Sequence, residues 1–220
     1  GEFPDLNEQE RLDFFRFYAE YVNGRVELLA GTGCIRYADT LALSNAVYEL
    51  GYTPMVISPY YFEMDQEKLF VYYDRLAKDV KGDLYLYNFP PRTGHSIAPE
   101  TIRRLIDANP NIIGLKDSVS IPGHTNMVCR AVEGKPFTVY SGFDDQFLSN
   151  IANNGGGGCI GALSIIVPEI WSSLVKAANE RDFDRTFALY HLIQKLMPIY
   201  DMDTNCSLIL KKLLVHRGLE

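Results

Sequence analysis

The sequence has few residues of the kinds that build metal sites and disulfide frameworks. Its four cysteines, Cys34, Cys129, Cys159 and Cys206, lie far apart, and its four histidines are equally scattered. They form no C-x-x-C pair and no H-E-x-x-H motif, so neither zinc ligation nor disulfide pairing is indicated. We therefore expect free thiols in a reducing compartment and no metal.

Long apolar runs and basic clusters are also absent. The 47% hydrophobic content is divided into short stretches, whereas a membrane-spanning helix needs about 20 consecutive apolar residues. The N-terminal GEFPDLNEQER is acidic and polar, unlike a secretory signal. The net charge of -7, without a lysine or arginine run, argues against nucleic acid and anionic membranes. We expect a cytoplasmic protein whose partner is a small metabolite.

Short β-rich runs recur along the chain, with helical patterns between them. The runs lie at residues 26–31, 54–58, 83–87, 111–116, 137–141 and 159–163, so their ends are 22–29 residues apart. One strand and one returning helix take up this length. The pattern predicts a parallel sheet, either open and doubly wound or closed as a β/α barrel. From Pro168 onward the pattern is helical nearly to the end of the chain.

Several of the helices carry start signals. Asn7 and Glu10 form an N-x-x-E start for residues 7–22, and Asp65 can cap residues 65–80, whose predicted apolar stripe includes Tyr72. Weaker or shorter helical patterns lie at residues 38–50, 98–108, 123–133 and 145–153. No G-x-G-x-x-G follows the first strand. The run NNGGGGCIG at residues 153–161 precedes a strand and does not open a helix, so we interpret it as a tight turn and not as a phosphate loop.

Polar side chains gather at the end of the third strand, in DLYLYNFPPRTGHS at residues 83–96. Because side chains alternate along a strand, Tyr85 and Tyr87 point one way and Leu84 and Leu86 the other. Active sites of both candidate folds lie at the carboxyl ends of the strands. Tyr87 is thus either a site residue or a core tyrosine whose hydroxyl bonds to the backbone.

The next strand, NIIGLKDS, ends in a lone lysine. Alternation puts Ile112 and Gly114 on the same face as Lys116, with Leu115 and Asp117 opposite. Burial of an ammonium group lowers its pKa, and the neutral amine that results is what Schiff-base catalysis needs. The alternative is that Lys116 pairs with a carboxylate of a neighbouring strand.

Two further segments offer binding groups. Arg92 lies in PPRTG, a turn restrained by its prolines, where its guanidinium can hold a substrate carboxylate or pair with a surface Asp or Glu. PYYF at residues 59–62 follows the second strand and can line a site, form a subunit contact or simply pack.

Together, GE at 1–2, AGTG at 30–33, SPYY at 58–61, YNFPPRTG at 87–94, GLKDS at 114–118 and SGFDD at 141–145 resemble the N-acetylneuraminate lyase and dihydrodipicolinate synthase family. The resemblance implies an α/β fold, a TIM (β/α)8 barrel of which this chain supplies about six βα units, with a C-terminal helical extension. It also implies a class I aldolase that uses pyruvate and needs no cofactor beyond the imine that its lysine forms.

The resemblance assigns roles to six residues. Lys116 would form the imine with the keto carbon of pyruvate, and Tyr87 would relay protons. Tyr61 would join the relay, in some family members across a subunit boundary, which implies a homodimer or homotetramer. Further ligands of the substrate would be Arg92 and main-chain groups of Gly142 and Ile160.

The branch of the family is less clear from these motifs. YNFP, KDS and the GH at 123–124 resemble the 2-keto-3-deoxy sugar acid aldolases, which release pyruvate and an aldehyde. Arg92 resembles the synthases that condense pyruvate with aspartate semialdehyde. The sialic-acid lyases fit worst, because Ala162 stands where they have a serine. We favour the sugar-acid aldolase and keep the synthase as the alternative.

The front of the chain departs from the family pattern. The G-T-T-G-E loop, which holds the pyruvate carboxylate, is represented only by Gly1 and Glu2. The resemblance predicts a partial barrel at residues 1–167, without the first two strands and first helix, and C-terminal helices at residues 168–220. Either the chain is part of a longer pyruvate aldolase or it is a non-catalytic remnant that has kept the fold.

Overall fold

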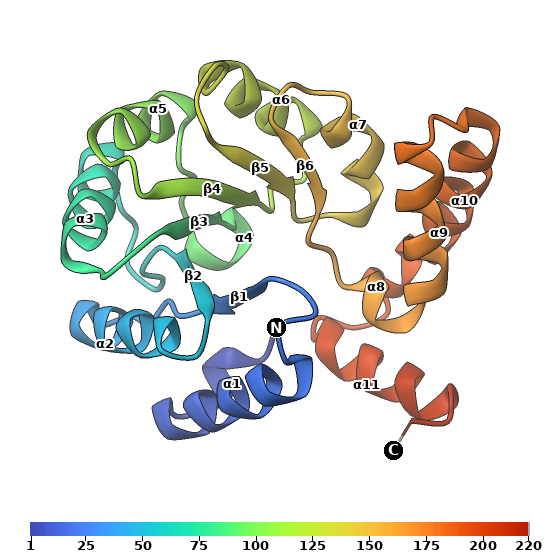
Figure 1. The fold of residues 1–220 in the computed structure, drawn as a ribbon, viewed down its shortest axis with the longest axis horizontal. Coiled ribbons are helices and arrows are strands. Elements are labelled where there is room, and N and C mark those ends of the chain that lie inside the picture. The colour runs from blue at the N-terminus through green and yellow to red at the C-terminus, as the bar shows by residue number, and fades with distance from the viewer. Residues whose placement is uncertain (220) are drawn as a thin grey trace.

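The computed structural model describes residues 1–219, and its centre is a parallel sheet whose strands are neighbours in chain order. The strands are β1 (Leu28–Gly31), β2 (Tyr52–Ile57), β3 (Leu84–Asn88), β4 (Ile112–Asp117), β5 (Thr138–Ser141) and β6 (Gly156–Cys159). The sheet curves, and the helices between strands lie along its outer side (Figure 1). A doubly wound sheet has helices on both faces and a reversal in strand order. The fold is therefore a partial TIM barrel, as the sequence predicts.

Helices alternate with the strands as far as β6 and then continue alone. Those of the barrel are α1 (Glu8–Val22), α2 (Tyr37–Tyr48), α3 (Gln66–Asp79), α4 (Pro90–Thr93), α5 (Pro99–Ala108), α6 (Pro122–Ala131) and α7 (Phe147–Ile151). After β6 come α8 (Leu163–Ile166), α9 (Pro168–Asn179), α10 (Phe183–Leu196) and α11 (Cys206–His216). Short 3-10 turns lie at η1 (Phe3–Asp5), η2 (Asp144–Gln146) and η3 (Met197–Asp201).

The predicted helix caps are confirmed. The Asn7 side chain accepts a hydrogen bond from the Glu10 amide at 3.0 Å, and the Glu10 carboxylate accepts one from the Asn7 amide at 2.8 Å. Asp65 accepts from the Lys68 amide at 2.8 Å and so begins α3. Along α3 the fully buried aromatic residue is Tyr73, whereas the predicted Tyr72 is only partly buried.

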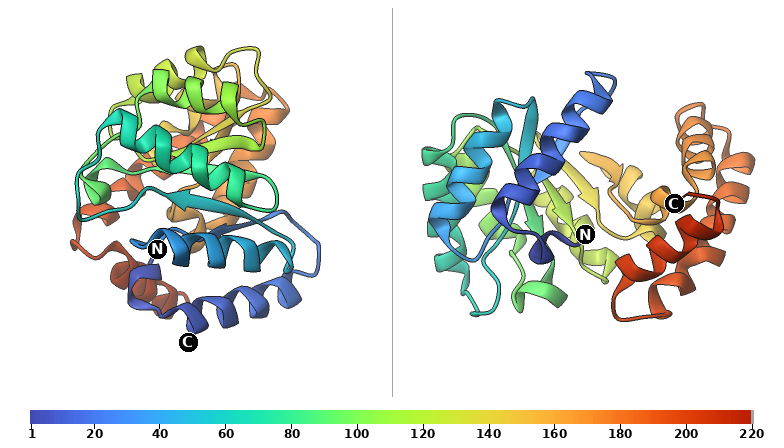
Figure 2. Two further views of the ribbon diagram at one scale, coloured as in Figure 1. Left: turned by 90° about the vertical axis from the view of Figure 1, so that its left-hand side faces the viewer. Right: turned by 90° about the horizontal axis from the view of Figure 1, so that it is seen from below.

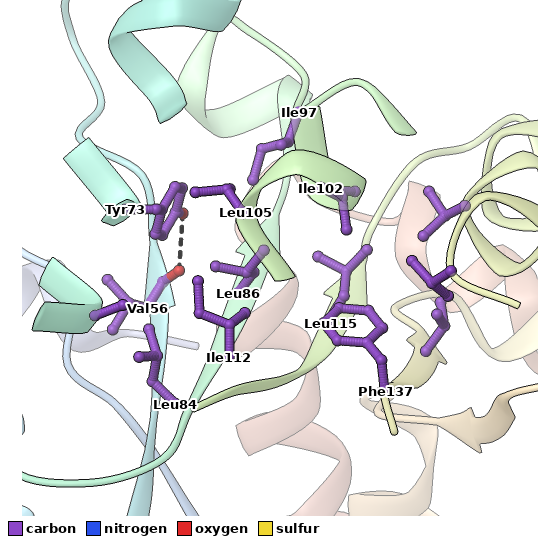
Figure 3. Close-up of a cluster of buried hydrophobic side chains, with 14 of the residues drawn as sticks. Val56, Tyr73, Leu84, Leu86, Ile97, Ile102, Leu105, Ile112, Leu115 and Phe137 are labelled. Carbon is purple, nitrogen blue, oxygen red and sulfur yellow. Dashed lines mark hydrogen bonds between the residues drawn. The ribbon is translucent and has the colours of Figure 1, made fainter. Parts of the chain in front are cut away.

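A hydrophobic cluster fills the space between the outer face of the sheet and α3, α5 and α6 (Figure 3). Leu86 and Leu115 enter it from β3 and β4, and the Tyr73 hydroxyl donates a hydrogen bond to the Val56 carbonyl at 3.0 Å. Ile112 lies in the same cluster, so the prediction that it shares a face with Lys116 is wrong. The physical cause is a register shift between β3 and β4, which gives β4 one extra residue and reverses the alternation before Gly114.

Two other segments differ from the sequence prediction. The glycines at residues 156–158 form β6 itself, where a tight turn before a strand at 159–163 was expected. A Cβ at Gly156 would lie 1.9 Å from the Asn150 carbonyl oxygen, so only glycine permits this approach of strand and helix. PPRT at residues 90–93 is the short helix α4 and not a turn, and it ends at Gly94 with a φ of 79°.

The last helices continue the arc beyond β6 (Figure 2). Phe147 of α7 and Trp171 of α9 meet at 5.3 Å in a second cluster that joins the barrel to α9 and α10. Lys211 of α11 forms an ion pair with Glu2 at 2.7 Å. The division of the chain at residue 167 stays a prediction. Within residues 1–219, no helix is both long and apolar enough to cross a membrane.

Candidate active site

Lys116 lies at the carboxyl end of β4, between Tyr87 of β3 and Tyr140 of β5 in the parallel register. Its Nζ is 4.5 Å from the centroid of the Tyr87 ring, and its side chain is only partly exposed. No carboxylate in the described part of the chain lies within 4.0 Å of this amine. The alternative that Lys116 pairs with a carboxylate of a neighbouring strand is therefore not observed. The amine instead faces an aromatic ring, which stabilises a cation by roughly 0.5–2 kcal/mol.

Tyr87 is held in place by aromatic stacking. Its ring lies 5.7 Å from that of Phe89, with an interplanar angle of 21°. No hydrogen bond partner of its hydroxyl lies among residues 1–219, so the alternative of a backbone-bonded core tyrosine is not observed either. A phenol beside an amine, with its hydroxyl uncommitted, has the chemical capacity to donate and accept a proton.

Two tyrosines close the barrel interior beneath this pair. Tyr85 and Tyr140 are 6.2 Å apart, and each ring passes over a glycine of the adjacent strand. A Cβ at Gly114 would lie 2.1 Å from the Tyr85 ring, and one at Gly157 would lie 2.7 Å from the Tyr140 ring. Burial raises the pKa of Tyr85 to about 12. The layer below Lys116 is therefore aromatic and tightly packed.

Gly142 and Ile160 lie just beyond the carboxyl ends of β5 and β6. The Gly142 amide donates to the Asp117 carbonyl at 2.8 Å, and the Ile160 amide donates to the Ser141 carbonyl at 2.9 Å. Both N–H groups are committed to the backbone, so the carbonyl oxygens are the groups that these residues can offer a substrate. A Cβ at Gly142 would lie 1.8 Å from the Ser118 hydroxyl oxygen, which explains the glycine.

Arg92 and Tyr61 lie at the surface. Arg92 is exposed on α4, where its guanidinium donates to the Thr204 carbonyl at 3.4 Å and pairs with no carboxylate of the described residues. Tyr61 is 84% exposed and has a φ of 85°, and its ring contacts Phe62 at 4.9 Å. Of the six predicted site residues, the structure therefore brings together Lys116 and Tyr87 most directly.

A buried carboxylate outside the six predicted site residues lies after β5. Asp144 is fully buried, and its Oδ2 accepts hydrogen bonds from the Tyr200 hydroxyl and the Ala162 amide. Burial raises the pKa of Asp144 despite these bonds. Burial and the charge of Asp144 also raise the pKa of Cys159 to about 12. The only sequence signal was an acidic pair in SGFDD, because Tyr200 lies 56 residues away.

The described residues were also searched for clusters of side chains that could bind a metal ion. No three His, Cys, Asp or Glu side chains of the described residues lie close enough together to hold a metal ion. The chemistry that the geometry offers is that of an amine, a phenol and carbonyl oxygens.

Comparisons with known proteins agree with this geometry. The Dihydrodipicolinate synthetase family matches residues 1–220. "Putative 2-dehydro-3-deoxy-D-gluconate aldolase YagE" of Escherichia coli K12 is 32% identical over 221 residues, which cover 99% of this chain and 73% of YagE. A 4-hydroxy-tetrahydrodipicolinate synthase of Kosmotoga olearia is 33% identical over 208 residues, which cover 93% of this chain and 70% of the synthase.

The structural similarity is equally extensive. The crystal structure of YagE in complex with pyruvate superposes with a TM-score of 0.94 at 31% identity, covering 100% of this chain and 74% of YagE. The 4-hydroxy-tetrahydrodipicolinate synthase of Methylacidiphilum fumariolicum SolV gives a TM-score of 0.88 at 30% identity, covering 99% of this chain and 72% of that one. The chain therefore belongs to the dihydrodipicolinate synthetase family of class I, pyruvate-dependent lyases and aldolases.

Proposed function

We propose that the chain carries the catalytic lysine of a Schiff-base aldolase that cleaves 2-keto-3-deoxy sugar acids of the gluconate type to pyruvate and an aldehyde. The observation that carries the proposal is the Lys116 amine, which has no carboxylate partner in the described chain and lies 4.5 Å from the ring of Tyr87. This is the combination of nucleophile and proton relay that imine chemistry requires.

The reaction follows from these two groups. The Lys116 amine adds to the C2 carbonyl of the 2-keto acid, and loss of water with uptake of one proton from solvent gives the protonated imine. The imine withdraws the electrons of the C3–C4 bond while Tyr87 accepts the proton of the C4 hydroxyl and passes its own proton to water, so the aldehyde leaves and an enamine remains. Protonation of the enamine at C3 and hydrolysis of the imine release pyruvate and restore the amine.

The remaining predicted residues have supporting roles in the proposal. The carbonyl oxygens of Gly142, after β5 beside β4, and of Ile160, after β6 beside β5, would orient the keto acid. Tyr61 would complete the proton relay from a partner subunit in a homodimer or homotetramer, which agrees with its exposure on one protomer. The partners would then be a 2-keto acid, an aldehyde and further copies of the chain.

The choice of substrate rests on motifs and on the relatives. YNFP, KDS and the pair at 123–124 favour the sugar acids, and the name of YagE agrees with them. The second candidate function is condensation of pyruvate with aspartate semialdehyde. Arg92 in the RTG motif favours it, and so does the 33% identity to a 4-hydroxy-tetrahydrodipicolinate synthase.

Trapping of the imine tests the proposal. We expect incubation with pyruvate and sodium borohydride to convert Lys116 to N-(1-carboxyethyl)lysine, detected by mass spectrometry of the peptide that contains it. Lys116→Arg removes the nucleophile and should give no adduct. Lys135→Arg is the matched control, because Lys135 pairs with Asp107 at the surface and should not affect trapping. A wild-type protein without the adduct would sink the proposal and favour the non-catalytic remnant.

A further inference from the structure

Asp117, the residue after Lys116, is a buried carboxylate with a full set of side-chain partners. It is 0% exposed. Its Oδ1 accepts a hydrogen bond from the side-chain amide of Asn88 at 2.9 Å. Its Oδ2 accepts hydrogen bonds from the Thr125 hydroxyl at 2.7 Å and from Nδ1 of His124 at 2.9 Å. None of these groups takes part in the proposed imine chemistry.

These partners join the ends of two strands to a helix. Asn88 is the last residue of β3 and Asp117 the last of β4, while His124 and Thr125 belong to the first turns of α6. Two backbone hydrogen bonds also connect these strand ends and add the end of β5. The Ser118 amide donates to the Asn88 carbonyl, and the Gly142 amide, just after β5, donates to the Asp117 carbonyl, both at 2.8 Å. The strand ends that carry Tyr87, Lys116 and Gly142 are thus fixed at one point.

The side chains of this cluster lie on the opposite face of the strands from the reactive pair. Asn88 follows Tyr87, and Asp117 follows Lys116, so alternation directs each cluster residue outward and its neighbour into the barrel. Asn88 is itself held, since its Oδ1 accepts from the Ile97 amide at 3.0 Å. A shift of Asp117 would therefore move the Cα of Lys116 relative to that of Tyr87.

We propose that Asp117 and His124, with Asn88, are positioning residues that hold the Lys116 amine in register with Tyr87 for imine formation. The inference rests on the proposed function and goes beyond it by assigning a role to the outer face of the same strand ends. It also gives a physical meaning to the Asp of the KDS motif and the His of the GH pair, which the reaction itself does not use.

The charge of the cluster depends on His124. Its burial lowers the pKa, but the hydrogen bond and charge of Asp117, the Ile97 carbonyl and Glu100 of α5 raise it above its usual value of 6.5 overall. Cys129 of α6 also faces Asp117, and burial with this charge raises the pKa of its thiol to about 11. The cluster therefore gains an ion pair as the pH falls through the folded-state pKa of His124, and loses it as the pH rises.

The experiment measures the rate of borohydride-trapped imine per folded molecule. Asp117→Asn mismatches at least one of the three donors, and we expect it to slow trapping about 10- to 100-fold, the effect of misplacing a reacting group by roughly 1 Å. Asn109→Ser is the matched control, because Asn109 is buried at the opposite end of β4 and bonds to Asp74 and Leu105. It should lower the melting temperature without slowing trapping.

His124→Asn provides the second test, because asparagine keeps a donor near the Nδ1 position but carries no charge. We expect the ratio of its trapping rate to that of the wild type to approach one at high pH and to fall as the pH decreases. If Asp117→Asn does not fold, the pH dependence of this ratio alone tests the positioning role.

The outcomes separate the two hypotheses. No adduct on the wild type overturns both the proposed function and this inference. An adduct on the wild type, with Asp117→Asn trapping at the same rate per folded molecule, overturns the inference and leaves the function standing. A ratio for His124→Asn that does not change with pH, or an Asn109→Ser variant as slow as Asp117→Asn, also overturns it.

Discussion

Arg92 is the single residue on which the substrate choice depends most. Its guanidinium is exposed, and within residues 1–219 its one hydrogen bond is a 3.4 Å bond to the Thr204 carbonyl, so it is free to reorient. A charge-assisted bidentate bond to a second carboxylate contributes roughly 1.5–3 kcal/mol, or about 10- to 100-fold in kcat/KM. A sugar acid has no second carboxylate. We therefore expect Arg92→Leu to leave cleavage of 2-keto-3-deoxygluconate within about threefold of the wild type.

The measurement is a side-by-side assay of pyruvate release and of condensation with aspartate semialdehyde. Arg104→Leu is the control, because Arg104 is also exposed but pairs with Glu67 on α3. If the wild type condenses aspartate semialdehyde efficiently and Arg92→Leu loses this activity about 10- to 100-fold, the synthase is the correct function.

The positions of single side chains can be predicted where a strand makes them alternate between its two faces. Contacts between residues that are distant in sequence cannot be predicted in this way. Tyr87 and Lys116 follow from their places at the ends of adjacent strands, and the structure puts ring and amine 4.5 Å apart. The bond between Tyr200 and Asp144 spans 56 residues, and no local pattern encodes it. Asp117 was placed on the correct face, but its three donors are visible only once β3 and α6 pack beside β4.

At the scale of elements, caps and repeats were informative and glycines were not. The caps at Asn7 and Asp65 fix the starts of two helices because each satisfies an otherwise unpaired amide. The glycines at residues 156–158 have no side chains to show a period of two, so their pattern predicts a turn although they form β6. The extra residue in β4 also follows from pairing with β3, which no local sequence signal reports.

The loop between β2 and α3 is predicted to loosen in acid. His95 is buried, its Nδ1 accepts a hydrogen bond from the Met64 amide at 3.3 Å, and its Nε2 bonds to the Ser58 hydroxyl at 2.8 Å. Burial lowers the pKa of His95 below 6.5, against a smaller opposing effect of Glu63. A lowered histidine pKa means that the unfolded chain binds the proton first, so this stabilisation is complete above pH 6.5 and is lost as the pH falls through the folded-state pKa.

Urea unfolding at a series of pH values measures this effect. We expect His95→Asn, which keeps an acceptor for the Met64 amide but does not titrate, to lose less free energy of unfolding than the wild type between pH 7 and pH 5. Ser58→Ala is the control, because it removes a bond of the same histidine without removing the titrating group. Equal acid slopes for His95→Asn and the wild type would contradict the prediction.

At the scale of the whole molecule, the repeat spacing was the most informative signal. Strand ends 22–29 residues apart predict strands that are neighbours in chain order, and β1 to β6 are arranged in this way. The helical pattern from Pro168 corresponds to α9, α10 and α11. Their packing was not predictable, because it depends on pairs such as Phe147 with Trp171 that are distant in sequence.

Self-association is the property of the whole molecule that the surface predicts. Tyr61 and Phe62 are 84% and 71% exposed at the end of the loop after β2, and Tyr61 keeps a positive φ of 85° that costs about 1–3 kcal/mol. Exposed aromatic residues on a strained backbone are typical anchors of a subunit contact.

We expect a homodimer or homotetramer by light scattering, and Tyr61→Asp should reduce the mass of this assembly. Phe17→Asp is the matched control, because Phe17 is also exposed, at 61%, but lies on the regular helical backbone of α1 and not on a strained loop, so it should not affect the mass. A monomeric wild type, or equal masses for wild type and Tyr61→Asp, would contradict the proposal that Tyr61 acts across a subunit boundary and would confine the chemistry to Lys116 and Tyr87.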